Sequence, residues 1–265
     1  MNKIKLIGAC LLLACTSSFA SPKDDIRHLQ SIDAFQGSDI KESQIEGLYL
    51  SSKNGKTIYV DKTGNFIISG QMFERKNNLL INLKDKQDRE ARYPNMQELL
   101  KHKDLFAHYP SLWVNDKGIA DKRASIYVFS DITCPHCKAF HKDIVELQKS
   151  GIEIFYVPFP RKGLEDYEAV RGLQKILCSK DKSEEYNKAF FNPSAYTKNV
   201  NSSDISCNSS YELLTYYKLA DNLGVIGTPA IFTEKGSAIF GYNGLLDFAT
   251  TLKQNLNDES FDEHK

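Results

Sequence analysis

The sequence predicts an α+β protein with two domains, and three observations support this prediction. Residues 45–83 alternate short apolar runs with turn residues, a pattern typical of antiparallel strands. Residues 85–93 are almost entirely charged and separate the strand-like pattern before them from a helical pattern after them. Residues 125–159 give a strand, a helix and a second strand, which predicts a parallel strand pair joined by a crossover helix.

The composition is that of a globular protein that can bury a substantial core. The chain has 265 residues, of which 41% are hydrophobic and 26% are charged, enough for one large or two small domains. Its formal charge is zero, and loss of Lys3 and Lys5 with a leader peptide would make it about −2. This balance gives no sign of a nucleic-acid partner.

The first twenty residues have the pattern of an export signal. Two lysines precede an apolar run over residues 4–15, and residues 18–20 form a small-x-small cleavage site. We therefore expect a signal peptide over residues 1–20 and a mature chain in the bacterial periplasm. The alternative is a lipoprotein with lipidated Cys15, which would need an unusually short leader. The apolar run is too short for a membrane anchor, which needs about 20 apolar residues.

Residues 21–86 are predicted to form a small N-terminal domain. The spacing of apolar residues over 26–35 predicts a short helix. Strands, with hairpin turns at Asn54-Gly55 and Thr63-Gly64-Asn65, are expected over residues 47–50, 57–60, 66–68 and 79–83. A unit of this size buries limited apolar surface and commonly needs a partner chain. Dimerisation is the simplest partner arrangement.

Residues 87–108 are predicted to form a linker and a helix. The charged run over residues 85–93 leads into residues 95–101, whose spacing is helical. A charged run is usually a solvated face, so the domain boundary is placed by the change from a strand-like to a helical pattern. The second domain is expected over residues 109–257, followed by a disordered acidic tail over residues 258–265.

The second domain begins with elements that place a cysteine at a helix start. Residues 125–130 are apolar, β-branched or aromatic, which predicts a buried strand. An apolar stripe over residues 135–147 predicts a helix, and Pro135 suits its first position. A second strand is expected over residues 152–159. Cys134 therefore lies at the N-terminal end of a helix.

Four cysteines remain once the leader is removed, an even number that suits two disulfides in an oxidising compartment. The simplest pairing joins Cys134 to Cys137 and Cys178 to Cys207.

The Cys134-Pro135-His136-Cys137 motif favours thiol redox chemistry. A helix N-terminus carries partial positive charge, so it lowers the pKa of Cys134 and favours its thiolate. Cys137 lies one turn further along, where it is shielded and can resolve a mixed disulfide. We expect His136 to stabilise the thiolate as well, with an exposed polar residue as the alternative.

Structural zinc is the main alternative for a Cys-X-X-Cys motif, and it generally needs a second ligand pair at similar spacing. Cys178 and Cys207 are 29 residues apart. His136 and His141 do not share a helix face. No metal and no cofactor are therefore expected.

Pro229 precedes an apolar run that otherwise resembles a strand interior, where proline is rare. A cis bond between Thr228 and Pro229 at the head of the strand would turn the Thr228 backbone outward to pair with an extended peptide. An ordinary trans turn proline is the alternative.

Several motifs together resemble the bacterial periplasmic disulfide isomerases of the DsbC/DsbG type. They occur in the family's order over nearly the whole mature chain and comprise residues 58–70, 129–137, 159–164, 177–182 and 223–230. The resemblance implies a cystatin-like N-terminal dimerisation domain, a linker helix and a C-terminal thioredoxin-fold domain with a helical insertion. It also implies a V-shaped homodimer.

The resemblance assigns roles to individual residues. Thr228 and Pro229 become the substrate-binding cis-proline pair beside catalytic Cys134, Cys137 and His136. The pair Cys178 and Cys207 becomes a structural disulfide, with free buried thiols as the alternative. Closing this loop should stabilise the domain by roughly 3–4 kcal/mol in the chain-entropy model.

The resemblance implies that reduced Cys134 attacks wrong disulfides in unfolded or misoxidised exported proteins. A substrate thiol or Cys137 then resolves the mixed disulfide, and a membrane thiol reductase supplies electrons. Pro135-His136 departs from the pattern, because it matches the monomeric oxidase DsbA, which favours a net dithiol oxidase as the first alternative. A holdase chaperone with a secondary redox site is the second. Val128 stands where thioredoxins place a buried acid, so proton transfer must use water or another group.

Overall fold

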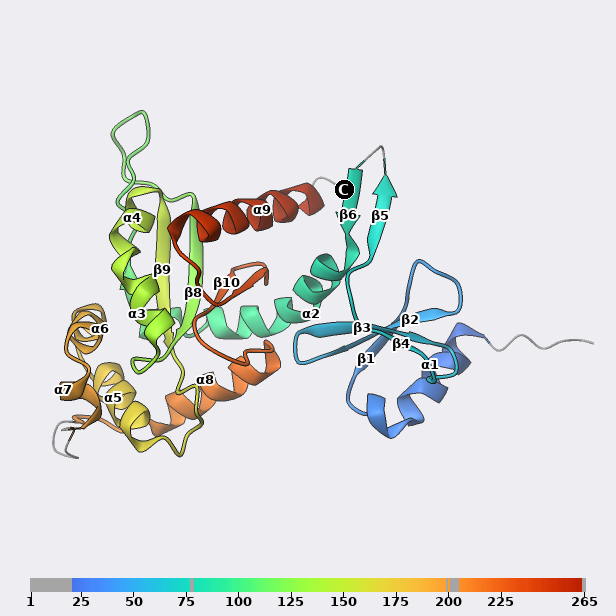
Figure 1. The fold of residues 1–265 in the computed structure, drawn as a ribbon, viewed down its shortest axis with the longest axis horizontal. Coiled ribbons are helices and arrows are strands. Elements are labelled where there is room, and N and C mark those ends of the chain that lie inside the picture. The colour runs from blue at the N-terminus through green and yellow to red at the C-terminus, as the bar shows by residue number, and fades with distance from the viewer. Residues whose placement is uncertain (1–20, 77–78, 199, 201–204, 264–265) are drawn as a thin grey trace, which may run out of the picture.

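The computed structural model describes residues 21–76, 79–198, 200 and 205–263. The signal peptide expected over residues 1–20, with the possible lipidation at Cys15, lies outside the described residues. The chain forms two parts joined by a long helix (Figure 1). No helix in the described ranges combines the length and apolarity needed to cross a membrane.

The N-terminal part is a four-stranded antiparallel sheet with one helix against it. Helix α1 (Pro22–Ser31) begins with a capping box between Ser21 and Asp24. The strands lie in the order β1-β2-β3-β4 and comprise β1 (Asp39–Glu42), β2 (Leu48–Lys53), β3 (Lys56–Asp61) and β4 (Ile67–Ile68). Their core of buried apolar residues comprises Leu29, Phe35, Ile40, Tyr49 and Val60. This core is as thin as the length of the segment predicts.

Two strands in this part are not apparent from the sequence. Strand β1 buries only Ile40, and β5 (Phe73–Lys76) has mostly polar residues, so neither shows a clear apolar alternation. Strand β5 forms a two-stranded antiparallel sheet with β6 (Leu79–Asn82). Pairing between neighbouring backbones, rather than side-chain pattern, defines these strands.

The charged run belongs to helix α2 (Leu83–Leu100), which begins after the N-cap Asn82 and continues through Pro94. The expectation of a solvated charged face is wrong for three of its residues, because Asp88, Arg89 and Arg92 are buried. Pairing makes this burial possible: the Asp88 carboxylate lies 2.8 Å from Lys84 Nζ and 3.7 Å from an Arg92 nitrogen.

The C-terminal part contains a five-stranded sheet in the order β11-β10-β8-β9-β7. Strands β8 (Ala124–Ser130) and β9 (Ile152–Pro158) are parallel, in agreement with the predicted crossover, and every residue of β8 is buried. The remaining pairs are antiparallel and involve β7 (Ala107–Tyr109), β10 (Ala230–Thr233) and β11 (Ala238–Phe240).

Helices cover both faces of this sheet. One core joins β8 and β9 to α3 (Pro135–Lys142), α4 (Ile144–Lys149) and α9 (Leu245–Glu263). The other joins the opposite face to α8 (Ser210–Asn222) and to Met96 and Leu99 at the end of α2. The last turns of the linking helix are therefore part of the C-terminal core. Helices α5 (Tyr167–Leu177), α6 (Lys182–Phe191) and α7 (Ser194–Thr197) form a group beside the sheet (Figure 1).

Two helix predictions for this part need correction. The helix expected over residues 135–147 divides at Asp143, whose carboxylate accepts a hydrogen bond from the Tyr242 hydroxyl. The tail expected to be disordered from residue 258 continues helix α9 to Glu263. Residues 258–263 contain no proline or glycine, so nothing in their backbone chemistry ends the helix at residue 257.

Candidate active site

A tight turn carries the chain from β8 into α3, and Asp131 organises it. Asp131 is fully buried, and one carboxylate oxygen accepts hydrogen bonds from the N–H and hydroxyl of Thr133, each at 2.7 Å. The other accepts the Arg161 N–H at 3.0 Å. The Asp131 carbonyl oxygen accepts the Cys134 N–H at 3.0 Å. Asp131 therefore holds the turn before Cys134 in shape and links it to the segment that contains Arg161.

Cys134 is the N-cap of α3, with extended backbone angles, and Pro135 occupies the first helical position. The Cys134 carbonyl oxygen accepts the first helical bond, from Lys138 N at 3.1 Å. Proline therefore occupies the helix position at which no N–H is needed. This arrangement leaves the Cys134 sulfur at the end of the helix that carries partial positive charge.

The surroundings of Cys134 favour its thiolate. The pKa of Cys134 falls from 9.0 to about 5, chiefly because the Cys137 thiol donates a hydrogen bond to its sulfur. Hydrogen bonds from Thr228 and from the main-chain N–H groups of His136 and Cys137 act in the same direction, against the effect of burial. At neutral pH the sulfur is therefore ionised and nucleophilic.

Cys137 has the opposite character. Its side chain is 1% exposed, and burial raises its pKa well above the usual value, with the hydrogen bond to Cys134 adding to the effect. The two thiols are free in this structure. One sulfur of the pair is thus ready to attack, while its neighbour holds a proton.

Thr228 and Pro229 lie against the Cys134 sulfur, and the peptide bond between them is cis. In the thiol form, Cys134 Sγ donates to the Thr228 carbonyl oxygen at 3.2 Å. With Cys134 as a thiol, the Thr228 hydroxyl is buried and has no hydrogen-bond partner in the described part of the chain, and it can donate to the sulfur once Cys134 is ionised. The structure thus brings together Cys134, Cys137, Thr228 and Pro229 from two segments that are far apart in sequence.

His136 is placed differently from the two cysteines. Its side chain is exposed on the first turn of α3. The group it directs at the Cys134 sulfur is its main-chain N–H rather than its imidazole. A role for the imidazole stays a prediction.

Buried polar groups behind Cys137 are a feature that the sequence interpretation did not identify. Val128 is fully buried in β8, and the core beside Cys137 contains Tyr156, Tyr186 and His141. His141 Nδ1 lies 3.1 Å from the Tyr156 hydroxyl, and burial lowers the pKa of His141 to about 4. The signal was present, because His141 follows Cys137 by four residues and so shares its helix face.

Cys178 and Cys207 form a disulfide away from these thiols. Cys178 directly follows α5, and Cys207 lies in the segment before α8. The bond therefore ties the group of helices α5, α6 and α7 to α8. Within the described residues no cluster of His, Cys, Asp or Glu could hold a metal ion.

Comparisons with known proteins show what the chain is similar to. Residues 117–258 match the thioredoxin-like domain family, and residues 17–85 match the disulfide bond isomerase protein N-terminal domain. The thiol:disulfide interchange protein DsbC of Salmonella typhimurium is 29% identical over 94% of this chain and 95% of its own length. DsbG of Escherichia coli is 29% identical over 67% of each chain. A solved disulfide interchange protein from Neisseria gonorrhoeae superposes with a TM-score of 0.44 at 20% identity, covering 57% of this chain and 96% of that one.

The thioredoxin-like domain and the thiol:disulfide interchange relatives together show a thiol-disulfide oxidoreductase. The chain belongs to the DsbC/DsbG family of thiol:disulfide interchange proteins. The predicted fold class is confirmed by the match of both domains.

Proposed function

We propose that the protein isomerises wrong disulfides in exported proteins through Cys134 and Cys137. The observation that carries the proposal is the contrast between the two thiols. The pKa of Cys134 is lowered to about 5, whereas the pKa of buried Cys137 is raised. A reduced site therefore keeps one permanent nucleophile and one protonated thiol at neutral pH.

The first step forms a mixed disulfide. The Cys134 thiolate attacks one sulfur of a client disulfide, the client S–S bond breaks, and the other client sulfur leaves as a thiolate. If another client thiolate then attacks the mixed disulfide, Cys134 leaves as a thiolate and the client has a new pairing. No electrons are gained or lost by the client in this cycle.

The second outcome uses Cys137. After it loses its proton, Cys137 attacks the Cys134 sulfur, the client leaves with both thiols reduced, and a Cys134–Cys137 disulfide remains. Two electrons have then passed to the client, and an external dithiol must return them. A membrane thiol reductase is the proposed donor.

Thr228 and Pro229 are the proposed binding residues for the client backbone. The Thr228 carbonyl oxygen accepts the Cys134 thiol at 3.2 Å, and a thiolate can no longer donate this bond. Ionisation therefore frees the carbonyl oxygen to accept a main-chain N–H from an extended client. Ile226, 82% exposed, offers an apolar contact just before this segment.

We propose a periplasmic homodimer. The N-terminal part has a thin core and exposes large apolar side chains along and beside β4, with Phe66 73% and Ile67 53% exposed. Apolar residues gathered on a small sheet indicate an interface. The relatives named DsbC support an exported location, where disulfides persist.

Refolding of scrambled RNase with several disulfides tests the isomerase proposal. The reduced protein should restore RNase activity catalytically, and Cys134→Ser should abolish this gain. Cys137→Ser should retain part of it, because the client can resolve its own mixed disulfide. The proposal fails if the reduced protein gives no gain over a matched small dithiol.

The main alternative is a net oxidase, which the low pKa of Cys134 and the Pro135-His136 pair favour. Thiol alkylation in cells separates the two functions. A mostly reduced Cys134–Cys137 pair supports the isomerase, and a mostly oxidised pair supports the oxidase. If the Cys134→Ala variant still protects clients fully from aggregation and supports RNase refolding as well as the parent does, the protein is a chaperone instead.

A further inference from the structure

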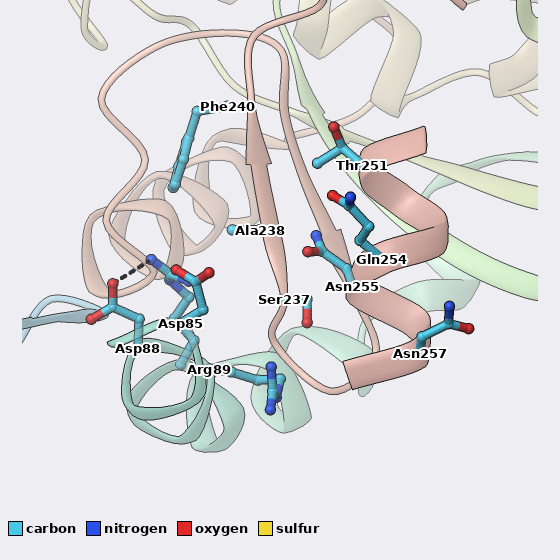
Figure 2. A pocket seen from close by; sticks show the side chains of 11 residues that line it. Asp85, Asp88, Arg89, Ser237, Ala238, Phe240, Thr251, Gln254, Asn255 and Asn257 are labelled. Atoms are coloured by element: carbon cyan, nitrogen blue, oxygen red, sulfur yellow. Dashed lines mark ion pairs between the residues drawn. The ribbon is translucent and has the colours of Figure 1, made fainter. Parts of the chain in front are cut away.

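A polar cavity of about 580 Å³ lies away from the thiols, between the linking helix, the edge strand of the C-terminal sheet and the last helix (Figure 2). Its lining comes from the first half of α2, from β11 with the residue before it, and from α9. Cavities of this size hold small organic ligands or short peptides. None of the proposed thiol chemistry uses it.

The α2 wall contains a cationic group that lacks a full set of partners. Arg92 is 7% exposed, yet its Nε has no hydrogen-bond partner among the residues that the structure describes. Its guanidinium lies 5.7 Å from the centre of the Phe240 ring, on the β11 side of the cavity. A buried guanidinium N–H without a partner is unfavourable, so an acceptor at this position would stabilise the site.

The acidic residues in the wall are already engaged. Asp88 accepts the Thr57 N–H at 2.6 Å and the Lys84 ammonium at 2.8 Å, besides its ion pair with Arg92, which Figure 2 shows. Asp85 accepts the Asn82 side-chain amide at 2.7 Å. Arg89 adds a second buried guanidinium to the lining. The Nε–H of Arg92 is therefore the donor that this wall offers to an anion.

The opposite walls provide neutral polar groups. Figure 2 shows Gln254 and Asn255 on α9 extending into the space that Ser237 and Ala238 border. The Ser237 hydroxyl is buried and, like Arg92 Nε, has no partner in the described part of the chain. Amides and hydroxyls of this kind can bind both N–H and C=O groups of a ligand.

The β11 wall provides main-chain groups as well. Gly241 N–H donates to Pro229 at 2.8 Å and the Ser237 carbonyl accepts from Thr233 at 3.0 Å, so these residues face β10. In an antiparallel ladder the intervening Ala238 and Phe240 must face the other way, and both line the cavity. β11 is the edge of its sheet among the described strands. The outward N–H and C=O groups of Ala238 and Phe240 thus border the same space as the Arg92 guanidinium.

We propose that this cavity binds the carboxyl-terminal end of a short peptide, with its carboxylate on Arg92 and its backbone along β11. A planar carboxylate matches the guanidinium fork, and strand addition to a sheet edge matches the outward main chain of Ala238 and Phe240. Bound there, the peptide would contact α2, β11 and α9 at once. The inference is independent of the proposed isomerase function, because it involves no thiol.

Binding of two matched probes tests the proposal. Acetyl-tetra-alanine with a free carboxylate and the same peptide with a C-terminal amide are titrated into the full chain carrying Cys134→Ala and Cys137→Ala, followed by NMR. The free acid should bind at least about tenfold more tightly, because charge-assisted hydrogen bonds contribute differences of that size. Equal binding of both probes, or binding of neither, overturns the proposal.

Variants locate the site. Arg92→Lys keeps the charge but removes the fork, and Ser237→Ala removes a hydroxyl without a partner, so each should weaken the free acid severalfold. Lys253→Gln is the matched control, because Lys253 is exposed on α9 and does not line the cavity. Unchanged insulin reduction by the single variants, with the thiols intact, shows that they fold. Equal weakening by Lys253→Gln would assign the effect to net charge and contradict the proposal.

A shortened chain excludes one competing occupant. Four of the eight residues after Asn257 are acidic, and the chain's own end is a competing occupant of the cavity. Binding of the free acid to a chain that ends at Asn257, but not to the full chain, would assign the site to that end and overturn the proposal. Binding to both supports it.

Discussion

The Cys134 sulfur lies 3.2 Å from the carbonyl oxygen of Thr228, a residue 94 positions further along the chain. The contact brings a helix start and a strand start together at one end of the sheet. It also makes the bonding at the site depend on ionisation, because a thiol donates to a carbonyl oxygen and a thiolate cannot. The hydroxyl of the same threonine has no described partner while Cys134 is a thiol, and it can donate to the sulfur of the thiolate.

Alkylation should follow the ionisation of Cys134. The pKa of Cys134 is lowered to about 5. Its rate of reaction with iodoacetamide should therefore rise between about pH 4 and pH 6 and level off above that range. Cys137 should not react over that range, because burial raises its pKa. Mass spectrometry of the modified cysteines as a function of pH measures both. A midpoint for Cys134 near that of a free thiol would contradict the assignment.

The same pKa shift makes the folding stability of the reduced form depend on pH. The folded pKa of Cys134 lies below its unfolded value, so the thiolate stabilises the folded state fully above the unfolded pKa. This stabilisation is lost as the pH falls through about 5. Reduced protein should therefore lose more stability than oxidised protein on acidification, as measured by urea unfolding of both forms. Parallel pH profiles for the two forms would contradict the prediction.

Thr228→Val should raise the pKa of Cys134, because valine keeps the shape of the side chain but removes the hydroxyl donor. One lost hydrogen bond to a charged sulfur is worth about 1.5–3 kcal/mol, which corresponds to about one or two pKa units. Thr228→Ser is the matched control and should keep the pKa close to that of the parent. The thiolate absorbance at 240 nm against pH gives the value for each. Equal shifts in both variants would show that the hydroxyl has no role.

The sequence predicts the position of Cys134 better than the surroundings of its sulfur. Capping chemistry places Cys134 and Pro135 by local rules, and the spacing of Cys137 fixes its depth in the helix. The neighbours of these thiols come from β9, α6 and the segment before β10, which no local pattern connects to them. The sequence indicates Pro229 because a proline there breaks a strand pattern, whereas Tyr156 and Tyr186 resemble ordinary core residues.

The charged run shows the same limit for the fold. Its composition is typical of solvent-exposed chain, yet Asp88 and Arg92 are buried, because Thr57 and Lys84 provide partners for the carboxylate. A partner from a strand 31 residues earlier cannot be recognised from composition. Likewise β1 and β5 are defined by the strands beside them rather than by their own residues.

The two buried tyrosines behind Cys137 should respond differently to loss of their hydroxyls. Tyr156→Phe removes a bond to His141 and should destabilise the protein by about 1 kcal/mol, as measured by urea unfolding. Tyr186→Phe removes a hydroxyl with no partner in the described chain, so it should leave stability unchanged or increase it. Destabilisation by Tyr186→Phe as large as that by Tyr156→Phe would show that the Tyr186 hydroxyl has a bound partner.

The Asn54-Gly55 turn between β2 and β3 packs against Arg92 and Leu223 and so contacts the C-terminal part. Gly55→Ala tests this contact. Gly55 has a φ of +65°, and an added Cβ would lie 2.7 Å from both Arg92 Cγ and the Leu223 carbonyl oxygen. Gly47 is the matched control, with a φ of +76° and no neighbouring atom within 4 Å. Backbone conformation alone should destabilise either alanine variant by roughly 1–2 kcal/mol.

Gly55→Ala should lose a further 1–3 kcal/mol or so from overpacking, or else move the N-terminal sheet away from α8. Urea unfolding of both variants measures the difference in stability, and small-angle scattering detects a separation of the two parts. Leu223 begins the segment that leads to Thr228, so a separated variant should also show altered alkylation of Cys134. Equal stability and identical scattering for the two variants would mean that this turn does not hold the parts together in solution.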